Sequence, residues 1–239
     1  MVVAEDEATA TENSSSIVLI IPESAIGMLP RKVFIATSNP GKLRDFAGAM
    51  AGVKAPCLEV LPGFSSLPAV EEDGATFAAN AAKKAAFYSA YSNSAIVLAD
   101  DSGLEVASLN GAPGVRSARY AADDSPEFKN TYTALSPDEA NNQRLLRELT
   151  EVPPEKRAGR FICVLAAAQN GNILQTFEGE VHGTILSALR GRHGFGYDPL
   201  FYLPQLGKTT AELTPEEKAH VSHRGQAFRK FLEWYNKQK

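Results

Sequence analysis

Two adjacent acids interrupt an apolar run near the middle of the chain. Asp100 and Asp101 follow the stretch AIVLA at residues 95–99, and Ser102 and Gly103 come next. Two carboxylates about 4 Å apart repel by roughly 1 kcal/mol in water and about 4 kcal/mol at a protein-like dielectric, and a metal ion or a proton relieves that repulsion. Because consecutive side chains of an extended chain point to opposite faces, we expect one acid to face a cleft and the other to brace the backbone. A solvated turn at the end of a buried strand is the alternative explanation of the pair.

A second acidic pair, Glu71 and Glu72, lies in a turn-rich loop before the Ala-rich stretch that begins at residue 76. Magnesium takes oxygen ligands, commonly one or two carboxylates completed by water and substrate phosphate. Neither the histidines nor the cysteines have a spacing suited to zinc. The acids therefore favour Mg²⁺, and the sequence leaves open which of Glu71 and Glu72 would serve it.

The stretch TSNPGK at residues 37–42 has the residue types of an anion site. It follows a predicted strand and opens a predicted helix at Pro40, so backbone N–H groups and Lys42 could hold a phosphate. Its spacing is not that of a Walker A loop. An ordinary turn with a solvated lysine is the alternative.

A lysine in the Ala-rich stretch at residues 76–92 is a second candidate for phosphate binding. This stretch is predicted to be a helix with Thr76 as its N-cap. Asn80 and Lys84 are four residues apart and so share a helix face. From that face Lys84 could reach a phosphate, or it could simply extend to water.

Residues that could bind a nucleobase lie in the last fifth of the chain. The stretch HGFGYDP at residues 193–199 sets Phe195 and Tyr197 among glycines, where an exposed ring could stack on a base. A tight turn with aromatic anchors is the alternative. Further on, a helix predicted over residues 222–237 brings His223 and Arg224 into its first turn, close in sequence to Lys218. These side chains suit an anion or a purine edge, and each alone is also consistent with a charged turn.

The order of predicted elements indicates an α/β fold. Strands are expected at residues 32–37, 57–61 and 95–99, and helices at residues 40 onward, 76–92, 136–149 and 222–237. Ser136 with Glu139 has the signature of a capping box. Asn170-Gly171 between two apolar runs predicts a β-hairpin.

Composition limits the class of protein. The chain has 239 residues, 44% of them hydrophobic and 22% charged, which is an ordinary globular balance, and its net charge of −4 disfavours nucleic-acid binding. Residues 1–30 lack the basic residues of a transit or secretory signal. The apolar run at residues 17–21 is too short to span a membrane. We expect a partly disordered tail over residues 1–30, and a cytoplasmic protein with two free cysteines.

Taken together, the motifs are far more specific than any one of them. TSNPGK, EEDGATFAANAAKKA, ADDSGLEV, GAPGVRSARYA, GFGYDPLF and ELTPEEKAHVSHRGQA occur in that order, and over about residues 32–236 the chain resembles the inosine triphosphate pyrophosphatase family. The resemblance implies hydrolysis of the non-standard purine triphosphates dITP, ITP and XTP to the monophosphate and pyrophosphate, with Mg²⁺ and as a homodimer. It also implies a two-lobed α/β domain over residues 31–239, in which a long central mixed β-sheet is flanked by helices and the active-site cleft lies between the lobes.

By motif position, the resemblance also implies roles for individual residues. Asp101 would be the catalytic acid/base group and a metal ligand, Lys84 would act on the phosphates, and Glu71 or Glu72 would be the second metal-linked acid. Substrate would be bound by Thr37, Ser38, Asn39, Pro40, Gly41, Lys42, Ser102, Phe195, Gly196, Tyr197, Asp198, Lys218, His223 and Arg224.

Two other functions remain as alternatives. A Maf-like nucleotide pyrophosphatase would share the reaction and prefer other modified nucleotides, but the SHRG and FGYD stretches argue against it. A nucleotide-binding module without catalysis would leave Asp101, Glu71 and Glu72 without a purpose.

Overall fold

The structure is a computed structural model, and it describes residues 32–50 and 55–238. The expected tail over residues 1–30 lies outside the described residues. All the elements below belong to the part of the chain that follows that tail.

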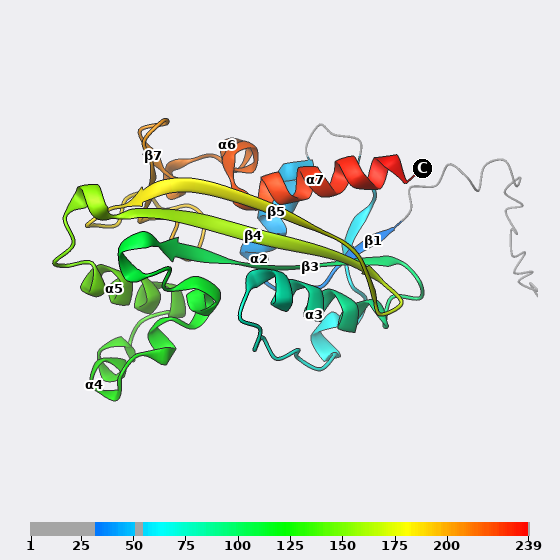
Figure 1. The fold of residues 1–239 in the computed structure, drawn as a ribbon, viewed down its shortest axis with the longest axis horizontal. Coiled ribbons are helices and arrows are strands. Elements are labelled where there is room, and N and C mark those ends of the chain that lie inside the picture. The colour runs from blue at the N-terminus through cyan, green and yellow to red at the C-terminus, as the bar shows by residue number, and fades with distance from the viewer. Residues whose placement is uncertain (1–31, 51–54, 239) are drawn as a thin grey trace, which may run out of the picture. The chain divides into compact units, whose positions relative to one another are not determined.

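A mixed sheet organises the described residues, in the strand order β2-β1-β3-β4-β5-β6-β7 (Figure 1). The strands are β1 Val33–Ile35, β2 Leu58–Val60, β3 Ile96–Val106, β4 Ala158–Gln169, β5 Asn172–Ile185, β6 Phe201–Leu203 and β7 Lys208–Thr209. β1 pairs in parallel with β2 and β3, and all later neighbours pair antiparallel. The predicted α/β class with a long mixed sheet is confirmed.

Helices cover both faces of the long strands β3, β4 and β5. They are α2 Pro40–Met50, α3 Phe77–Ser89, α4 Pro126–Lys129, α5 Pro137–Glu148, α6 Pro215–Val221 and α7 His223–Lys237. In Figure 1, α7 lies on one face of these strands and α3 on the other. Two core clusters follow from this arrangement, because alternate strand residues face alternate sides. Leu98 packs with α2 and α7, whereas Val97 and Ala99 pack with α3.

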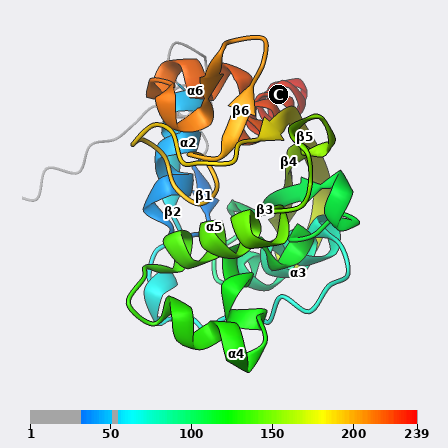
Figure 2. The same ribbon diagram turned by 90° about the vertical axis from the view of Figure 1, so that its left-hand side faces the viewer.

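A third cluster fills the far end of the long strands. There Leu104 and Phe161 pack with Leu145 of α5 and with Phe201 of β6. Figure 2 shows α5 in front of β3, with α6 and β6 on one side and α3 and α4 on the other. The elements therefore fall into two groups joined by β3–β5, as expected for a two-lobed domain.

Local signals in the sequence fix several element ends. Thr76, Ser136 and Ser222 each accept a backbone hydrogen bond as N-caps, and Ser136 with Glu139 forms the predicted capping box. The β4–β5 turn has φ of 51° at Asn170, next to a glycine that also has positive φ. These backbone angles are those of a two-residue hairpin turn, so the predicted hairpin is confirmed.

The expectation that a strand ends at the adjacent acids is wrong. β3 runs through both of them to Val106, with Asp100 opposite Leu165 and Asp101 opposite Val164 in the antiparallel ladder with β4. Backbone pairing does not depend on the side chain, and both carboxylates find polar partners within the protein. A charged pair in the sequence therefore did not mark the edge of the sheet.

Candidate active site

A cavity of about 270 Å³ lies over the middle of β3, between the two groups of elements. Eleven of the predicted site residues line it: Asn39, Lys42, Glu72, Asp101, Ser102, Phe195, Gly196, Tyr197, Asp198, His223 and Arg224. The other predicted residues, which are not among the lining residues, are Thr37, Ser38, Pro40, Gly41, Glu71, Lys84 and Lys218. The motifs of the sequence thus converge on one place.

The two adjacent acids face opposite sides of β3. Asp101 faces α3, where Asn80 Nδ2 donates to Asp101 Oδ2 at 2.9 Å and Lys84 Nζ lies 3.9 Å from Oδ1. Asp100 faces α7 and is 2% exposed, with Lys42 Nζ at 3.0 Å and Arg224 Nε at 3.5 Å. One acid therefore stands on the cavity wall, and the other is enclosed by cations behind it.

These surroundings give the two acids different proton affinities. Burial disfavours the ionised form of Asp100, but Lys42 and Arg224 outweigh burial and hold its pKa well below the usual range. For Asp101 burial prevails over Lys84 and Asn80, so its pKa is raised. Asp100 is accordingly a fixed negative charge, and Asp101 is the better proton acceptor of the two.

Glu72, and not Glu71, reaches the cavity. Glu72 is half-buried on the cavity wall and forms an ion pair with Lys84, whereas Glu71 is exposed. The loop carrying Glu72 is tied down on both sides. Arg119 Nη2 donates to Glu72 O at 2.8 Å, and Gly74 N donates to Asn80 Oδ1 at 2.7 Å.

Lys84 is largely buried between acids. Burial lowers the pKa of Lys84, but the negative charges of Asp100, Asp101 and Glu72 together raise it by more, so the net shift is upward. The ammonium group therefore stays charged. It lies beside the cavity wall formed by Asp101 and Glu72, where a phosphate would meet it.

The carboxylates at the cavity fit a magnesium ion that would take its remaining ligands from water and from the substrate phosphates. Over residues 32–50 and 55–238, no group of three or more His, Cys, Asp or Glu side chains could enclose a metal by itself. Asp101 and Glu72 are two carboxylates on one wall, and magnesium commonly takes one or two carboxylates together with water and phosphate oxygens. These two residues are the ones that would hold it.

The stretch at residues 37–42 forms the turn from β1 into α2. Asn39 caps the helix, since its Oδ1 accepts from the N–H of Gly41 at 2.8 Å and of Lys42 at 3.1 Å. Thr37 Oγ1 accepts in turn from Asn39 N at 3.2 Å. The helix N-terminus expected to cradle a phosphate is thus present, with a side-chain cap on two of its N–H groups.

Phe195 lies across this helix start. A Cβ on Gly41 would come within 2.6 Å of Phe195 Cε1, so only glycine leaves room for the ring. The ring centroid is 5.0 Å from Lys218 Nζ and 5.0 Å from Arg224 Cζ, within cation–π range. Phe195 is half-buried and lines the cavity, so one of the two predicted aromatic side chains is available to a ligand.

The expectation of an exposed ring at Tyr197 is wrong. Tyr197 is 4% exposed and donates its hydroxyl to Ser117 O at 2.8 Å, which anchors the loop to the 3₁₀ helix Gly114–Arg119. Asp198 anchors the same loop from the other side. Its Oδ2 accepts from Phe195 N at 2.9 Å and from Lys218 Nζ at 2.6 Å.

His223 lies at the start of α7 and lines the cavity. It is 4% exposed, and its ring stacks on Phe161 with centroids 4.9 Å apart and planes 14° apart. Burial, followed by the charges of Arg224 and Lys218, pushes its pKa well below the ordinary value. Its Nδ1 has no hydrogen-bond partner among the described residues, so a neutral imidazole with an unused polar atom lines the cavity.

Arg224, on the cavity wall, links α2 to β3. It donates from Nη1 to Asp45 Oδ2 at 3.0 Å and from Nη2 to Ser102 Oγ at 2.6 Å. Lys218 shares Asp45 at 3.4 Å. Both cations are therefore held by carboxylates.

Several residues at the site had no assignment from the sequence. Phe161, Asp138 and Asn141 line the cavity, while Asn80 and Asp45 lie directly behind it. The sequence did indicate that Asn80 could lie near the site, since it shares a helix face with Lys84. The others look like core, helix-cap or surface residues when the sequence is read segment by segment.

The fold and this site define an α/β protein whose cavity suits an anionic ligand with an aromatic part. Lys42, the start of α2 and the carboxylates of Asp101 and Glu72 would suit phosphate and metal, and Phe195 and His223 supply ring surfaces. The chain belongs to the Ham1 family, whose model matches residues 33–234.

Relatives agree over most of the chain. A dITP/XTP pyrophosphatase of Acidobacterium capsulatum is 51% identical over 200 residues, which is 84% of this chain and 96% of the relative. One from Thermus thermophilus is 44% identical over 204 residues, 85% of this chain and 91% of the relative.

Solved structures agree as well. The Ham1 protein of Staphylococcus aureus superposes with a TM-score of 0.70 at 36% identity, covering 87% of this chain and all of the other (100%). A HAM1 protein from Coxiella burnetii gives 0.70 at 34% identity, covering 86% and 98%. Within the described part of the chain, no helix is both long and apolar enough to cross a bilayer.

Proposed function

We propose that this protein hydrolyses the non-standard purine triphosphates dITP, ITP and XTP to the nucleoside monophosphate and pyrophosphate. The observation that carries the proposal is the convergence of Asp101 and Glu72, both paired with Lys84, on a cavity that Phe195 and His223 also line. The names of the relatives, dITP/XTP pyrophosphatase, support the choice of substrate. Residues 31–239 are proposed as the single domain that does this.

In the proposed reaction, Asp101 accepts a proton from the water that attacks the α-phosphorus. Its raised pKa suits that role, because a base works best when its pKa is close to the working pH. A new P–O bond forms at the α-phosphorus as the anhydride bond to the β-phosphorus breaks, and pyrophosphate leaves. Mg²⁺, when held by Asp101 and Glu72, neutralises charge on the phosphate oxygens.

Cations of this chain stabilise the leaving group. Lys84 stays charged beside the two acids, and Lys42 and Arg224 stand on the cavity wall. Lys42 and Arg224 are paired with Asp100. A phosphate that enters therefore meets cations already oriented, which is the preorganisation that electrostatic catalysis requires. Thr37, Ser38, Asn39, Pro40 and Gly41 complete the phosphate and sugar side, with Ser102 beside them.

The base would be read at the other side of the cavity. Phe195 would stack on the purine, within a loop that Gly196, Tyr197, Asp198 and Lys218 hold. A neutral His223 or the neighbouring Arg224 would donate to the 6-oxo group of inosine or xanthine. Adenine carries a 6-amino donor there, and a donor left unpaired in a buried site costs about 1–3 kcal/mol.

Assays of pyrophosphate release test this proposal. With Mg²⁺, we expect ITP, dITP and XTP to be cleaved at least about a hundredfold more efficiently than ATP, the discrimination available to a buried polar contact. Removal of Mg²⁺ should abolish release. Tight ITP binding without release would favour a binding module, and preference for other modified nucleotides a Maf-like enzyme. We also propose a homodimer in the cytoplasm, which sedimentation and cell fractionation would test.

A further inference from the structure

The inward face of α5 is polar where it meets the cavity. Asn141 and Asn142 are 3% and 5% exposed, and Asp138 lies one turn earlier on the same face, at the rim of the cavity. Burying side-chain amides costs free energy unless they are hydrogen-bonded. The proposed mechanism uses none of these three residues, so their presence needs another explanation.

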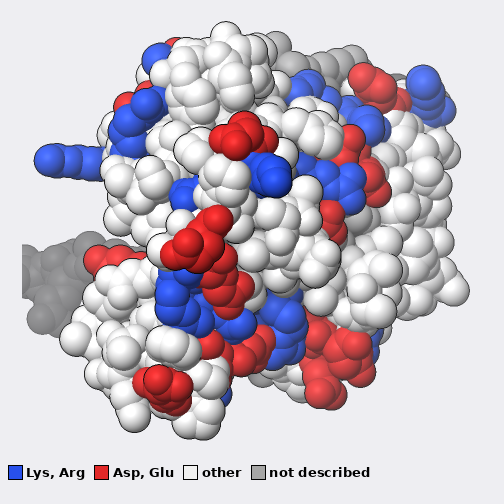
Figure 3. Space-filling model, turned by 60° about the vertical axis from the view of Figure 1, so that its left-hand side comes forward, with Lys and Arg blue, Asp and Glu red and all other residues white. Residues whose placement is uncertain are grey.

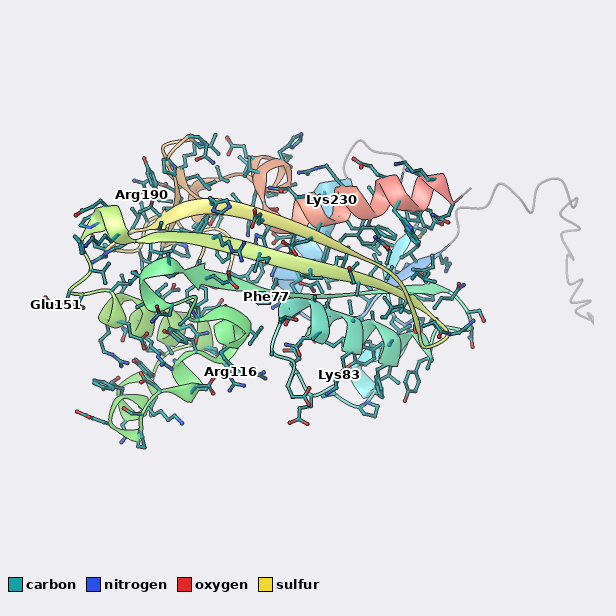
Figure 4. All side chains as sticks on the ribbon, viewed as in Figure 1. Phe77, Lys83, Arg116, Glu151, Arg190 and Lys230 are labelled. Carbon is teal, nitrogen blue, oxygen red and sulfur yellow. The ribbon has the colours of Figure 1, made fainter. Side chains whose placement is uncertain are left out.

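Two of these side chains hold one residue of the loop that carries Phe195. Gly196 N donates to Asp138 Oδ2 at 2.7 Å, and Asn142 Nδ2 donates to Gly196 O at 2.9 Å. Both polar groups of Gly196 are thus bound by residues four apart on one helix. Figure 4 shows α5 with its side chains below the strands.

The third side chain does the same for another segment of the cavity wall. Ala121 N donates to Asn141 Oδ1 at 2.8 Å, and Asn141 Nδ2 donates to Ala118 O at 3.2 Å. Ala118 itself lines the cavity. Side chains of α5 therefore hydrogen-bond to the backbone of two segments that line the cavity.

The hold on Gly196 decides where the neighbouring ring lies. Gly196 has a φ of 60° and is directly bonded to Phe195, whose ring lies over Gly41 and beside Arg224. Other anchors of the loop act at Tyr197 and Asp198, and upstream at His193, whose N–H donates to Ala211 O at 3.1 Å. None of these anchors holds a polar group of Gly196. Without the contacts from α5, the Gly196 peptide groups would turn to water and the ring would lose its fixed orientation.

We propose that Asp138 and Asn142 are positioning residues, which hold Gly196 so that Phe195 is set in place for the nucleotide base. The proposal rests on the proposed function for its ligand, and on the observed hydrogen bonds for its geometry. Asp138 and Asn142 act through Gly196 rather than on the reacting atoms.

Hydrogen exchange measured by mass spectrometry on the nucleotide-free protein tests the hold directly. In Asp138→Ala, peptides that cover residues 193–199 should exchange about tenfold faster or more, since losing a hydrogen bond to a charged group corresponds to about tenfold or more. In Asn142→Ala, which loses a hydrogen bond between two neutral groups, they should exchange about threefold faster or more. Asp138→Asn keeps an acceptor oxygen and should exchange close to wild type. Gln143→Ala, an exposed position on the same helix, is the control and should match wild type.

Kinetics with ITP test the consequence. Both alanine variants should raise KM about tenfold while kcat changes less than about threefold, the pattern expected when binding is lost equally in the ground and transition states. A purely structural role would lower the melting temperature and leave KM unchanged. Asn142 is the sharper variant because it does not line the cavity, so its effect cannot come from direct contact with substrate.

Several results would overturn the proposal. The proposal is refuted if hydrogen exchange is unchanged in a folded Asn142→Ala. It is also refuted if exchange is faster but KM is unchanged, or if KM is raised without faster exchange. If Asn142→Ala does not fold, the comparison of Asp138→Ala with Asp138→Asn decides by the same criteria. If the wild-type protein cleaves no purine triphosphate, the proposed function fails, and a missing effect on exchange would still separately refute the hold on Gly196.

Discussion

The side-chain amide of Asn80 connects the two acidic segments of the cavity. It donates to Asp101 Oδ2 at 2.9 Å and accepts from Gly74 N at 2.7 Å, two residues after Glu72. Asn80 is completely buried at 0% exposure. One side chain thus fixes both the orientation of the proposed base and the loop that carries its partner.

We expect Asn80→Ala to lower kcat for ITP about tenfold to a hundredfold, because a hydrogen bond to a charged group contributes about 1.5–3 kcal/mol. KM should change little, since Asn80 does not line the cavity. Lys83→Ala, an exposed position on the same helix whose side chain is labelled in Figure 4, is the control. Equal kcat in the two variants would contradict the role of Asn80.

The adjacent acids of β3 provide a matched pair of isosteric variants. Asp101→Asn should abolish turnover, by about a thousandfold or more, and leave ITP binding measurable by calorimetry, because it removes the proton acceptor. Asp100→Asn should lower stability by about 1.5–3 kcal/mol, because Lys42 loses its carboxylate partner while Arg224 keeps the one on Asp45. Full activity in Asp101→Asn would refute the assignment of the base.

The glutamates that precede α3 form a second matched pair. Glu72→Gln should weaken activation by Mg²⁺, raising the half-maximal concentration about tenfold or more, whereas Glu71→Gln should behave as wild type. Glu72 lies on the cavity wall and Glu71 is exposed. Titration with Mn²⁺ followed by electron paramagnetic resonance measures the same difference without turnover. The reverse order of effects would assign the metal to Glu71.

Gly41 and Gly48 both lie on α2 and differ in what surrounds them. A Cβ at Gly41 would lie 2.6 Å from Phe195 Cε1, whereas at Gly48 the nearest atom would be 3.3 Å away. Gly41→Ala should therefore displace Phe195 and raise KM for ITP about tenfold. Gly48→Ala should leave KM unchanged, and its effect on stability should be the balance between a gain of up to about 1 kcal/mol in helix propensity and the tight contact of its Cβ with Ala219. Steady-state kinetics and urea unfolding separate the two effects.

Acid should destabilise the protein through Asp100. Its folded-state pKa lies below the unfolded value of about 3.9, so the ionised form stabilises the fold above that value and this contribution is lost as the pH falls through and below it. Urea unfolding from about pH 6 down to pH 3 should show wild type losing more stability than Asp100→Asn. Parallel losses in both proteins would contradict the shift.

Much of the fold was predictable because its signals are local. The caps at Thr76, Ser136 and Ser222 and the turn at Asn170 depend on residues within three or four positions. The α/β class followed from the order of elements, and the mixed sheet was implied by the family resemblance. These features need no knowledge of distant contacts.

The parts that could not be predicted depend on distant contacts. β3 continues through Asp100 because Lys42 and Arg224, from α2 and α7, neutralise a charge that looked solvent-exposed. Tyr197 is buried because its hydroxyl donates a hydrogen bond to the carbonyl oxygen of Ser117, in a distant segment of the chain. Phe161 lies mid-strand and so resembled a core residue, although it also lines the cavity.

Charge on the surface did not mark the site either. Figure 3 shows acidic and basic side chains intermixed over one face of the molecule, without an extended region of a single sign. The charges that matter are paired within the protein, as Lys218 is with Asp198 and Asp45. A sequence-wide net charge therefore says little about a cavity built from such pairs.

Side chains along β3 alternate between two faces of the sheet, so the register of this strand decides both which residues pack in each core and which acid faces the cavity. A shift by one residue relative to β1 and β4 would turn Asp101 toward Arg224 and Asp100 toward Asn80, since every side chain of a strand changes face together. After such a shift an aspartate would still face Asn80, because the two neighbours are both acids, but Leu98 would leave its packing with α2 and α7 for the face of α3. A single-residue insertion ahead of Asp100 would therefore be more damaging here than many substitutions at the cavity wall.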